Sequence, residues 1–196
     1  MAPPALQEPT PSLVAEYVAR FEGDDQTVAT DRVVSRLFQA HPHNRDIEDV
    51  LLKVVALNGL YSTNIYGTYA VAVHIRELGI DPQLERKSLD VVDQVARVKL
   101  GGKTKRLYSF ATKYCSWHVP DAYPIYDTFI EQLLWAYREQ YGFAQFARTD
   151  LRDYPRFKEI VEWFQARYGL TEFNFKQLDK FLWRYGRELF APAGWA

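Results

Sequence analysis

The sequence is short of the residues that build disulfides and metal sites. Its 196 residues include one cysteine, Cys115, and four histidines. A single cysteine cannot form a disulfide within the chain, and these few residues lack close metal-ligand spacing. We therefore expect no structural zinc, no iron–sulfur cluster and no other cofactor. The shortage of cysteine, together with the lack of a secretory signal, favours a cytoplasmic protein.

Long apolar runs and an excess of positive charge are also missing. No run approaches the ~20 apolar residues that a membrane-spanning helix needs. The net charge is −1, which counts mildly against a nucleic-acid-binding protein. It does not exclude one, because local basic clusters set the potential that faces a phosphate.

Apolar and aromatic residues are abundant instead. Hydrophobic residues make up 47% of the chain and aromatic residues 15%, which is enough for a real core and excludes disorder over most of the length. Apolar residues recur at helical spacing, and strand signals are nearly absent apart from an ambiguous Val95–Leu107. We expect an all-α fold of about nine or ten helices. Residues 1–11, with four prolines, are expected to form a flexible tail, and residues 12–196 a single domain.

The periodicity also predicts where the helices lie. Asn44 is expected to cap the third helix, Gly79 to end the fourth, and Asn174 with Gln177 to form a capping box at the last. Between the fifth and sixth helices, Lys99–Arg106 is expected to be a basic, glycine-containing loop. The expected helices are Leu13–Phe21, Val28–Phe38, Ile47–Leu57, Thr63–Leu78, Pro82–Val98, Ser109–His118, Pro124–Tyr141, Pro155–Tyr168 and Asn174–Phe190.

The stretch from Tyr108 to Asp127 is the most informative part of the chain. It predicts a helix, a short proline-bounded loop and a second helix that opens with Pro124. Proline suits a first helical turn, so Asp127 is expected in that turn or just past it. The positive end of a helix favours an ionised carboxylate, which can stabilise an oxocarbenium-like sugar cation and orient water. Taken alone, an aspartate at a helix start is more often an ordinary cap.

The surrounding residues add a family resemblance. Ser109, Ala111, Pro124, Ile125 and Asp127 fit the catalytic segment of helix-hairpin-helix (HhH-GPD) DNA glycosylases. The segment looks closest to a divergent 8-oxoguanine and adenine-mismatch branch, strongly over about twenty residues. The resemblance implies a two-lobed helical fold with a degenerate helix-hairpin-helix and an active site in the cleft. It also implies Asp127 as the catalytic residue and double-stranded DNA as the partner of a monomer.

Two residues of the preceding helix are further catalytic candidates. Lyase-competent members carry a lysine where this chain has Ser109, and a serine cannot form a Schiff base, which favours a monofunctional enzyme. Lys113 lies one turn along the same helical face. It is either a base, a phosphate contact or an amine nucleophile, or else a solvated or snorkelling lysine.

The DNA contacts are expected from a basic segment. The resemblance implies a Leu-Pro-Gly-x-Gly turn just before Ser109, but residues 105–108 read Lys-Arg-Leu-Tyr. Gly101 and Gly102 lie further upstream, so either the turn is longer, or Lys103, Lys105 and Arg106 bind phosphates through their side chains. The alternative is a solvated basic loop.

Five further residues are expected to contact the substrate. The resemblance implies that Asn58, Tyr61 and Asn64 fill the gap left by a flipped nucleotide or contact the opposite base, and the alternative is a plain turn between helices. Tyr126 is expected to line the base pocket. His118 either donates to the substrate or, as we favour, caps its helix as a cation.

The expected function is therefore that of a DNA glycosylase. It would excise a damaged or modified base and leave an abasic site, in DNA repair or in antiviral defence against hypermodified phage bases such as glucosylated hydroxymethylcytosine. Two alternatives stay open: a non-catalytic DNA-binding module of the same fold, and a helical interaction domain that binds no nucleic acid. The degenerate hairpin and the net acidity favour the first of these alternatives.

Overall fold

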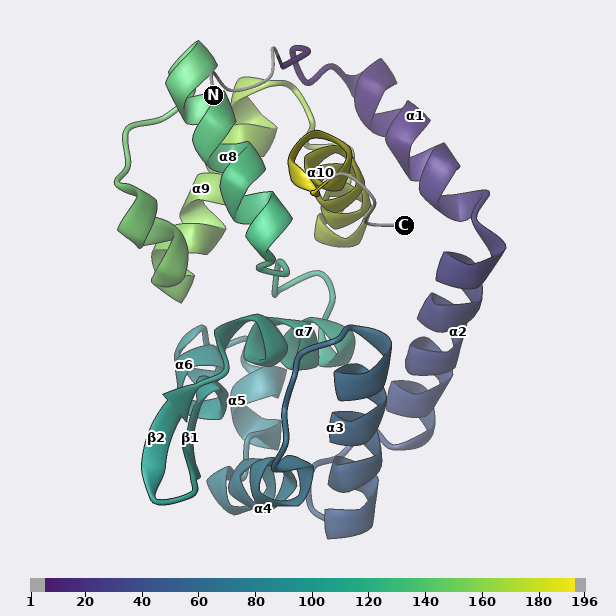
Figure 1. Cartoon of the computed structure of the whole chain (residues 1–196), viewed down its shortest axis with the longest axis vertical. Coiled ribbons are helices and arrows are strands. Elements are labelled where there is room, and N and C mark those ends of the chain that lie inside the picture. Colours follow the sequence, from purple (N-terminus) through teal and green to yellow (C-terminus); the bar gives the residue numbers. More distant parts are fainter. Residues whose placement is uncertain (1–5, 193–196) are drawn as a thin grey trace. The chain divides into compact units, whose positions relative to one another are not determined.

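The computed structural model describes residues 6–192 and is mostly helical, as expected (Figure 1). Within that range the chain forms ten α-helices, one 3-10 helix and one two-stranded sheet. In chain order these elements are α1 (Pro11–Glu22), α2 (Asp25–Ala40), α3 (Ile47–Leu60), α4 (Thr68–Leu78), α5 (Asp81–Glu85), α6 (Asp90–Ala96), β1 (Arg97–Leu100), β2 (Lys103–Arg106), α7 (Tyr108–His118), α8 (Thr128–Tyr141), η1 (Arg148–Arg152), α9 (Tyr154–Arg167) and α10 (Phe175–Phe190).

The chain divides into two compact units. One, the terminal unit, combines the N-terminal segment up to Asp25 with the C-terminal segment from Tyr126 onward. The other, the central unit, is the continuous segment Gln26–Ile125. The terminal unit contains α1, α8, η1, α9 and α10, and the central unit contains the remaining elements.

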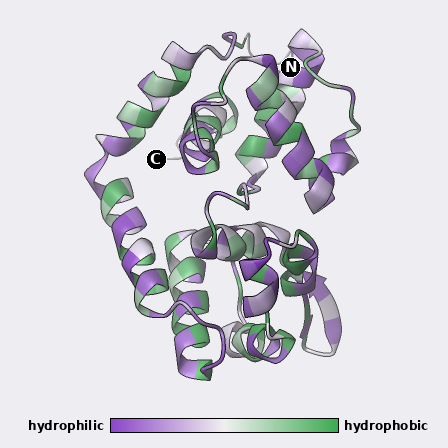
Figure 2. Cartoon of the chain, turned by 180° about the vertical axis from the view of Figure 1, so that it is seen from behind, coloured by the Kyte–Doolittle hydropathy of each residue, from purple (hydrophilic) through white to green (hydrophobic). Residues whose placement is uncertain are grey.

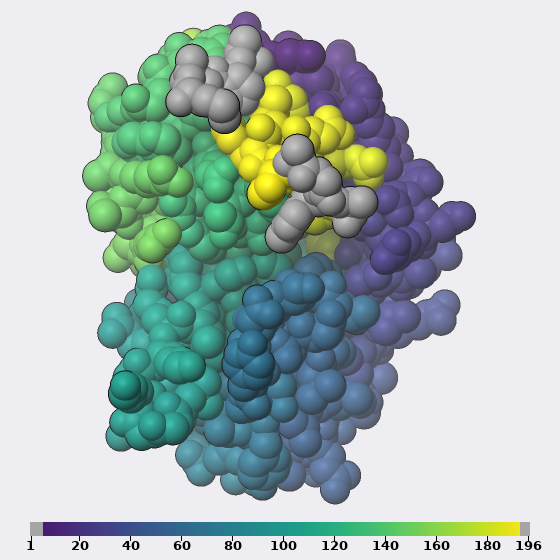
Figure 3. Space-filling model, in the orientation of Figure 1, coloured from purple at the N-terminus to yellow at the C-terminus, as the bar shows by residue number. Residues whose placement is uncertain are grey.

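In the terminal unit, α10 packs against both α1 and α8. The expected capping box is confirmed, because Asn174 and Gln177 each bond to the other's backbone N–H. The buried face of α10 includes Phe181 and Tyr185, whose rings pack on Tyr17 of α1. Figure 3 shows the yellow surface of α10 alongside the purple surface of α1. Aromatic burial therefore joins the two ends of the chain.

Part of the expected flexible tail is held on this unit. Leu6 is buried, and its backbone N–H donates to Gln140 Oε1 at 3.1 Å. The next backbone N–H, that of Gln7, donates to the Tyr185 hydroxyl at 2.9 Å. Residues 6 and 7 are therefore anchored by buried and hydrogen-bonded groups, whereas residues 1–5 of the expected tail lie outside the described range.

In the central unit, α3 packs against α4 and α7, and α6 packs against α7. Apolar and polar residues alternate along the helices of this unit, as Figure 2 shows for α2. Val54 and Leu57 of α3, Ile75 of α4 and Phe110 of α7 are buried together in the core. The core of this unit therefore follows the helical spacing of apolar residues in the sequence.

Two expected helix boundaries in the central unit are wrong. The helix expected from Thr63 begins at Thr68, because Ser62 and Asn64 have φ of 48° and 56° and cannot continue a right-handed helix. The single helix expected over Pro82–Val98 is broken after α5, where Lys87 has φ 56°. The chain then forms α6 and leaves it at Arg97 as a strand.

The expected basic loop Lys99–Arg106 is a β-hairpin. β1 pairs with β2 in antiparallel register, with Leu100 opposite Lys103. The two residues between the strands, Gly101 and Gly102, have φ of 57° and 76°, as a two-residue hairpin turn requires. Four-residue strands were too short for alternation to stand out in the sequence.

The helix expected from Pro124 begins at Thr128 instead. Asp127 is thus not in the first helical turn. It is the N-cap, with extended backbone (φ −139°, ψ 158°). Proline at position 124 is compatible with the extended segment that leads into this cap.

Replacement of Gly186 by alanine is expected to destabilise the terminal unit. A Cβ at Gly186 of α10 would lie 2.7 Å from the backbone oxygen of Phe129 in α8, so the two helices would have to separate. We expect a loss of about 1–3 kcal/mol in unfolding free energy, measured by urea denaturation. The matched control is Gly59→Ala in α3, where nothing lies within 4 Å. That variant should gain up to ~1 kcal/mol, and equal stability of both variants would contradict the close approach.

Candidate functional site

Helix α7 brings Ser109 and Lys113 together. The Lys113 Nζ atom donates to Ser109 Oγ at 2.8 Å, across one helical turn. The Lys113 side chain is 5% exposed, and its Nζ lies 5.9 Å from the centre of the Tyr61 ring. It is therefore not a solvated surface lysine, because the buried ammonium is bound by a hydroxyl and faces an aromatic ring.

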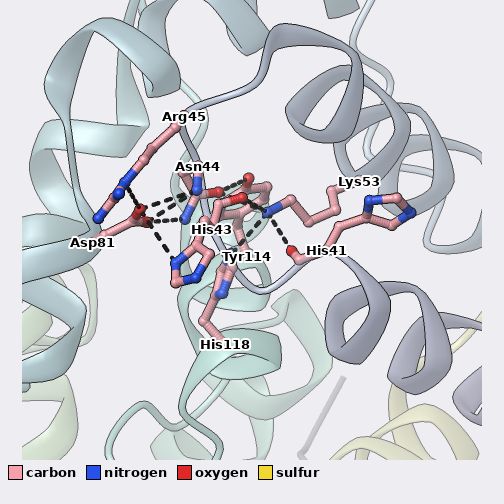
Figure 4. Close-up of polar contacts among 8 residues, drawn as sticks. All are labelled: His41, His43, Asn44, Arg45, Lys53, Asp81, Tyr114 and His118. Atoms are coloured by element: carbon pink, nitrogen blue, oxygen red, sulfur yellow. Dashed lines mark hydrogen bonds and ion pairs between the residues drawn. The ribbon is translucent and has the colours of Figure 1, made fainter.

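A second buried lysine lies at the centre of the polar cluster shown in Figure 4. Lys53 of α3 is 0% exposed. Its Nζ donates to the backbone oxygens of His41 and His43 at 3.0 and 2.8 Å and to Asn44 Oδ1 at 2.9 Å. Burial lowers the pKa of Lys53 to about 8, against the opposing attraction of Asp81 and Asp49. The three acceptors offset the cost of burying this ammonium.

Asn44 connects Lys53 to two other helices. Its side-chain oxygen also accepts from the Tyr114 hydroxyl of α7. Its backbone N–H and its side-chain amide both donate to the Asp81 carboxylate at the start of α5, the latter at 2.7 Å. Asn44 was expected to cap α3, but Asp46 is the N-cap. Asn44 is instead a buried junction between α3, α5 and α7.

The carboxylate of Asp81 completes this cluster toward the surface. His43 Nδ1 lies 3.8 Å and Arg45 Nε 3.6 Å from its Oδ2 atom. Arg45 is largely exposed, whereas the Asp81 side chain is only 9% exposed. The whole network therefore contains a buried cation and a buried anion joined by one amide, with its outer edge in solvent.

His118, the last residue of α7, is part of the same network. Its Nε2 atom lies 3.5 Å from Lys53 Nζ, and its ring packs edge-on against Phe38. Burial and the nearby Lys53 ammonium lower the pKa of His118 to about 3. The ring is therefore neutral at pH 7, and the expected cationic cap of α7 is wrong.

The last turn of α3 and the segment after it contain the three residues expected to contact DNA bases, with Asn58 inside the helix. Asn58 binds within the turn: its Oδ1 accepts from the Ile65 N–H at 2.8 Å and its Nδ2 donates to the Ile65 oxygen at 3.0 Å. Tyr61 donates to Asp31 at 3.4 Å and its ring lies 6.5 Å from that of Trp117. Asn64 is exposed. The Asn58 side chain thus holds the backbone of this turn in place through two hydrogen bonds to Ile65.

The three expected phosphate contacts lie on β2. All four residues of β2 are exposed, including Lys103 and Lys105. Arg106 donates to Asp93 at 3.2 Å and stacks on the Tyr108 ring at 4.2 Å. Burial would raise the pKa of Asp93, but its hydrogen bonds to Arg97 and Arg106 outweigh burial and lower it. One arginine is therefore held in place while the two lysines project into solvent.

Asp127 and Tyr126 belong to the terminal unit. The Asp127 side chain accepts from the Phe129 N–H at 3.0 Å and is half-buried. Tyr126 is 6% exposed and donates to Glu131 one turn into α8. Burial and that hydrogen bond raise the pKa of Tyr126 to about 12. The Tyr126 hydroxyl is thus buried and hydrogen-bonded to Glu131.

Glu131 is a buried carboxylate that sequence reasoning missed. It is 4% exposed. Arg148 Nε donates to its Oε1 at 2.8 Å, and Arg152 Nε to its Oε2 at 3.3 Å. These bonds fasten η1 to α8 beside the Asp127 cap. Burial would raise the pKa of Glu131, but the hydrogen bonds from Tyr126 and Arg148 and the charge of Arg152 lower it.

The expected site residues thus fall into separate groups. Ser109, Lys113 and Tyr61 lie close together in the central unit, and the β2 cations lie on its hairpin. The missed residues are Lys53, Asn44, Asp81 and Glu131. One feature of the sequence could have indicated a buried Lys53, because this residue interrupts the apolar face of α3 between Val50 and Leu57.

Two further findings concern metals and membranes. Among residues 6–192, no group of three or more His, Cys, Asp and Glu side chains is placed to hold a metal ion. Over the same range, every helix is too short or too polar to cross a bilayer.

Comparisons with known proteins place the chain in a family. Residues 13–122 match the family model HI_0787_N, described as an N-terminal domain. An uncharacterized protein from Haemophilus influenzae is 44% identical over 147 residues, which cover 74% of this chain and 69% of the relative. The chain therefore belongs to the HI_0787_N family. No solved structure matches it.

Replacement of Lys53 by methionine is expected to destabilise the central unit strongly. Methionine fills similar space but donates no hydrogen bond, so the carbonyls of His41 and His43 and the Asn44 side chain lose a buried donor. We expect a loss of about 3 kcal/mol in unfolding free energy, measured by urea denaturation. The matched control, Lys105→Met on exposed β2, should change stability by less than about 0.5 kcal/mol. Similar losses in both variants would show that the Lys53 network contributes nothing specific.

The stability of the wild-type chain is expected to depend on His118 at acid pH. The pKa of His118 is about 3 when folded, below the ordinary value of about 6.5 in an unfolded chain. Below pH 6.5 the unfolded state therefore binds more protons at this residue than the folded state does. The contribution of His118 to the free energy of unfolding is thus lost as the pH falls towards 3. The stability difference between wild type and His118→Gln should shrink between pH 7 and 4 in parallel denaturation series. Parallel curves would contradict a buried neutral ring.

Proposed function

We propose that the chain is a DNA glycosylase that extrudes a damaged or modified base from duplex DNA and hydrolyses its N-glycosidic bond. The observation that carries this proposal is the position of Asp127. Its carboxylate follows Pro124-Ile125-Tyr126 and accepts a hydrogen bond from the first turn of α8. A two-lobed glycosylase-like fold is part of the proposal, and the division into two compact units supports it.

The proposed role of Asp127 is electrostatic. The Asp127 carboxylate accepts from the Phe129 N–H at the positive end of α8, which fixes its position. As the base departs, the sugar carbon develops positive charge, and a preplaced carboxylate stabilises that charge without reorganising. The same group can orient the water that adds to the sugar, which leaves an abasic site.

Ser109 and Lys113 have supporting roles in this proposal. A serine cannot form a Schiff base with the sugar, so hydrolysis without strand cleavage is proposed. Lys113 donates to Ser109, which suits a lysine that orients a hydroxyl or binds a phosphate better than an amine nucleophile. Such a nucleophile must be neutral and accessible, and Lys113 is 5% exposed.

The DNA contacts are proposed from the exposed cations of the hairpin. Lys103, Lys105 and Arg106 would bind the phosphate backbone. Asn64 and Tyr61 would contact bases, with Asn58 shaping the turn that presents them. Tyr126 would support the Asp127 segment through Glu131, and His118 would support α7. A cytoplasmic monomer acting in repair or in antiviral defence completes the proposal.

A non-catalytic DNA-binding module is the second candidate. It is favoured by the β-hairpin, which stands where the related glycosylases have a phosphate-binding Gly-rich turn. It predicts that the chain retains DNA but releases no base from any substrate. A helical interaction domain would not bind DNA in a salt-dependent manner.

Replacement of Asp127 by asparagine is expected to abolish base release while the fold is kept. Asparagine is as good an N-cap as aspartate, so α8 should be unaffected, but the negative charge is lost. We expect base release to fall by roughly a hundredfold or more with DNA affinity unchanged. The assay incubates modified phage DNA and damaged oligonucleotides with protein and reveals abasic sites by alkaline cleavage.

Asp153→Asn is the matched control, because Asp153 caps α9 in the same unit by accepting from the Arg156 N–H. It should release bases at the wild-type rate. Wild-type turnover by Asp127→Asn would discard the mechanism. Borohydride should trap no covalent adduct with wild type, and an adduct that disappears in Lys113→Ala would make Lys113 the nucleophile.

A further inference from the structure

Two tyrosines are exposed at the start of α4, one just before the helix and one in its first turn. Tyr66 is 97% exposed and Tyr69, in the first turn of α4, is 62% exposed. Neither side chain makes a hydrogen bond or a ring contact with any residue between 6 and 192. Tyrosine rings are usually half or more buried, since they carry a large apolar surface. Two neighbouring exposed rings therefore indicate a surface that binds something.

These tyrosines adjoin the β-hairpin. Gly67 lies between Tyr66 and α4, and a Cβ at that position would be 3.0 Å from the Leu100 side chain at the end of β1. Helix α4 also packs against β1. Figure 3 shows the blue surface of the α4 region next to the teal surface of the hairpin. The backbone that carries Tyr66 and the start of α4 therefore pack next to the end of β1.

The hairpin is strongly basic. Residues 97–106 contain five cations and no acid, namely Arg97, Lys99, Lys103, Lys105 and Arg106. Asp93 binds both arginines. By contrast, the three lysines are exposed and form no ion pair within the described part of the chain. Figure 2 shows β2 in the hydrophilic colours. Lys103 and Lys105 pair with Leu100 and Val98, so they project from the face of the hairpin whose Leu100 side chain approaches Gly67, whereas Lys99 projects from the opposite face.

The turn that carries Tyr66 is held in one conformation. Asn58 binds both the N–H and the oxygen of Ile65, the residue before Tyr66. Ile65 itself is 4% exposed. The backbone next to Tyr66 is therefore fixed before any ligand binds, which lowers the entropy cost of binding.

We propose that two tyrosines and two lysines of the hairpin, namely Tyr66, Tyr69, Lys103 and Lys105, form a binding surface for an unpaired nucleic-acid strand. Bases stack on the two rings, and the phosphates between them contact Lys103 and Lys105, which share one face of the hairpin. Flat rings next to cations fit alternating bases and phosphates, whereas an acidic protein partner needs only the cations. The inference deepens the proposed function, since it rests on a nucleic-acid partner and names the unpaired strand as what the surface binds.

The test measures binding of fluorescent single-stranded and fully paired oligonucleotides of one sequence by anisotropy, over a series of salt concentrations. Wild type should bind the single strand more tightly than the duplex. Tyr66→Ala should bind the single strand about fivefold or more weakly, without a change in salt dependence. Tyr66→Phe, which keeps the ring, should bind like wild type, and Tyr66→Leu, which keeps apolar area without a ring, should bind like Tyr66→Ala.

Lys103→Gln should act differently from the tyrosine variants. It removes one phosphate contact, so the slope of log K against log salt should fall in size by about 0.7. Lys87→Gln is the matched control, because Lys87 is an exposed lysine of the same unit outside the hairpin. It should leave affinity and slope unchanged.

The outcomes separate this surface from the glycosylase proposal. Tyr66→Ala and Lys103→Gln variants that bind like wild type would overturn the surface, even if wild type releases bases. Binding with equal affinity to duplex and single strand would also overturn it, as would a preference for poly-glutamate. If these variants lose single-strand binding, the proposed binding surface is supported. If wild type in addition releases no base, the glycosylase proposal is discarded while the surface stands.

Discussion

The buried ammonium of Lys53 is the interaction on which the central unit depends. An unpaired charge inside a protein costs several kcal/mol, so Lys53 is tolerated only while its three oxygen acceptors stay in place. Two of those oxygens belong to the backbone of the segment between α2 and α3, and the third belongs to Asn44. Asn44 in turn binds Asp81 and Tyr114. One charge therefore fixes a connecting segment, the start of α5 and the middle of α7 at once.

The Lys53 network also fixes the position of helix α7. Tyr114 and His118 lie on the same helix as Ser109 and Lys113, so an α7 held at two points by the Lys53 cluster keeps the Lys113–Ser109 pair in place. The terminal unit contains a similar network, in which the buried charge is negative instead of positive. Glu131 is a buried anion that binds Arg148, Arg152 and Tyr126, and it lies one turn past the Asp127 cap. In both units a buried charge supports the candidate residues without being one itself.

The sequence predicted most helices, because apolar spacing in α1, α2, α3, α9 and α10 reports burial directly. It failed where backbone conformation decides: Ser62, Asn64 and Lys87 adopt positive φ without being glycine. It also failed at the buried charges, since the partners of Lys53 come from residues 41 to 118 and such pairing has no local signature. Asp127 was correctly expected at a helix start, but the start lies four residues later than Pro124 suggested.

The two proposals draw on different parts of the chain. The segment that matches the family, residues 13–122, contains Tyr66, the hairpin and the Lys53 network, and it ends before Asp127. The Asp127 cap and the Glu131 cluster follow in the terminal unit. A net charge of −1 conceals this arrangement, because the hairpin concentrates five cations in ten residues while the acids are spread over the rest. Binding and chemistry would therefore be separable by mutation: loss of the carboxylate would leave a strand-binding domain, not an unfolded chain.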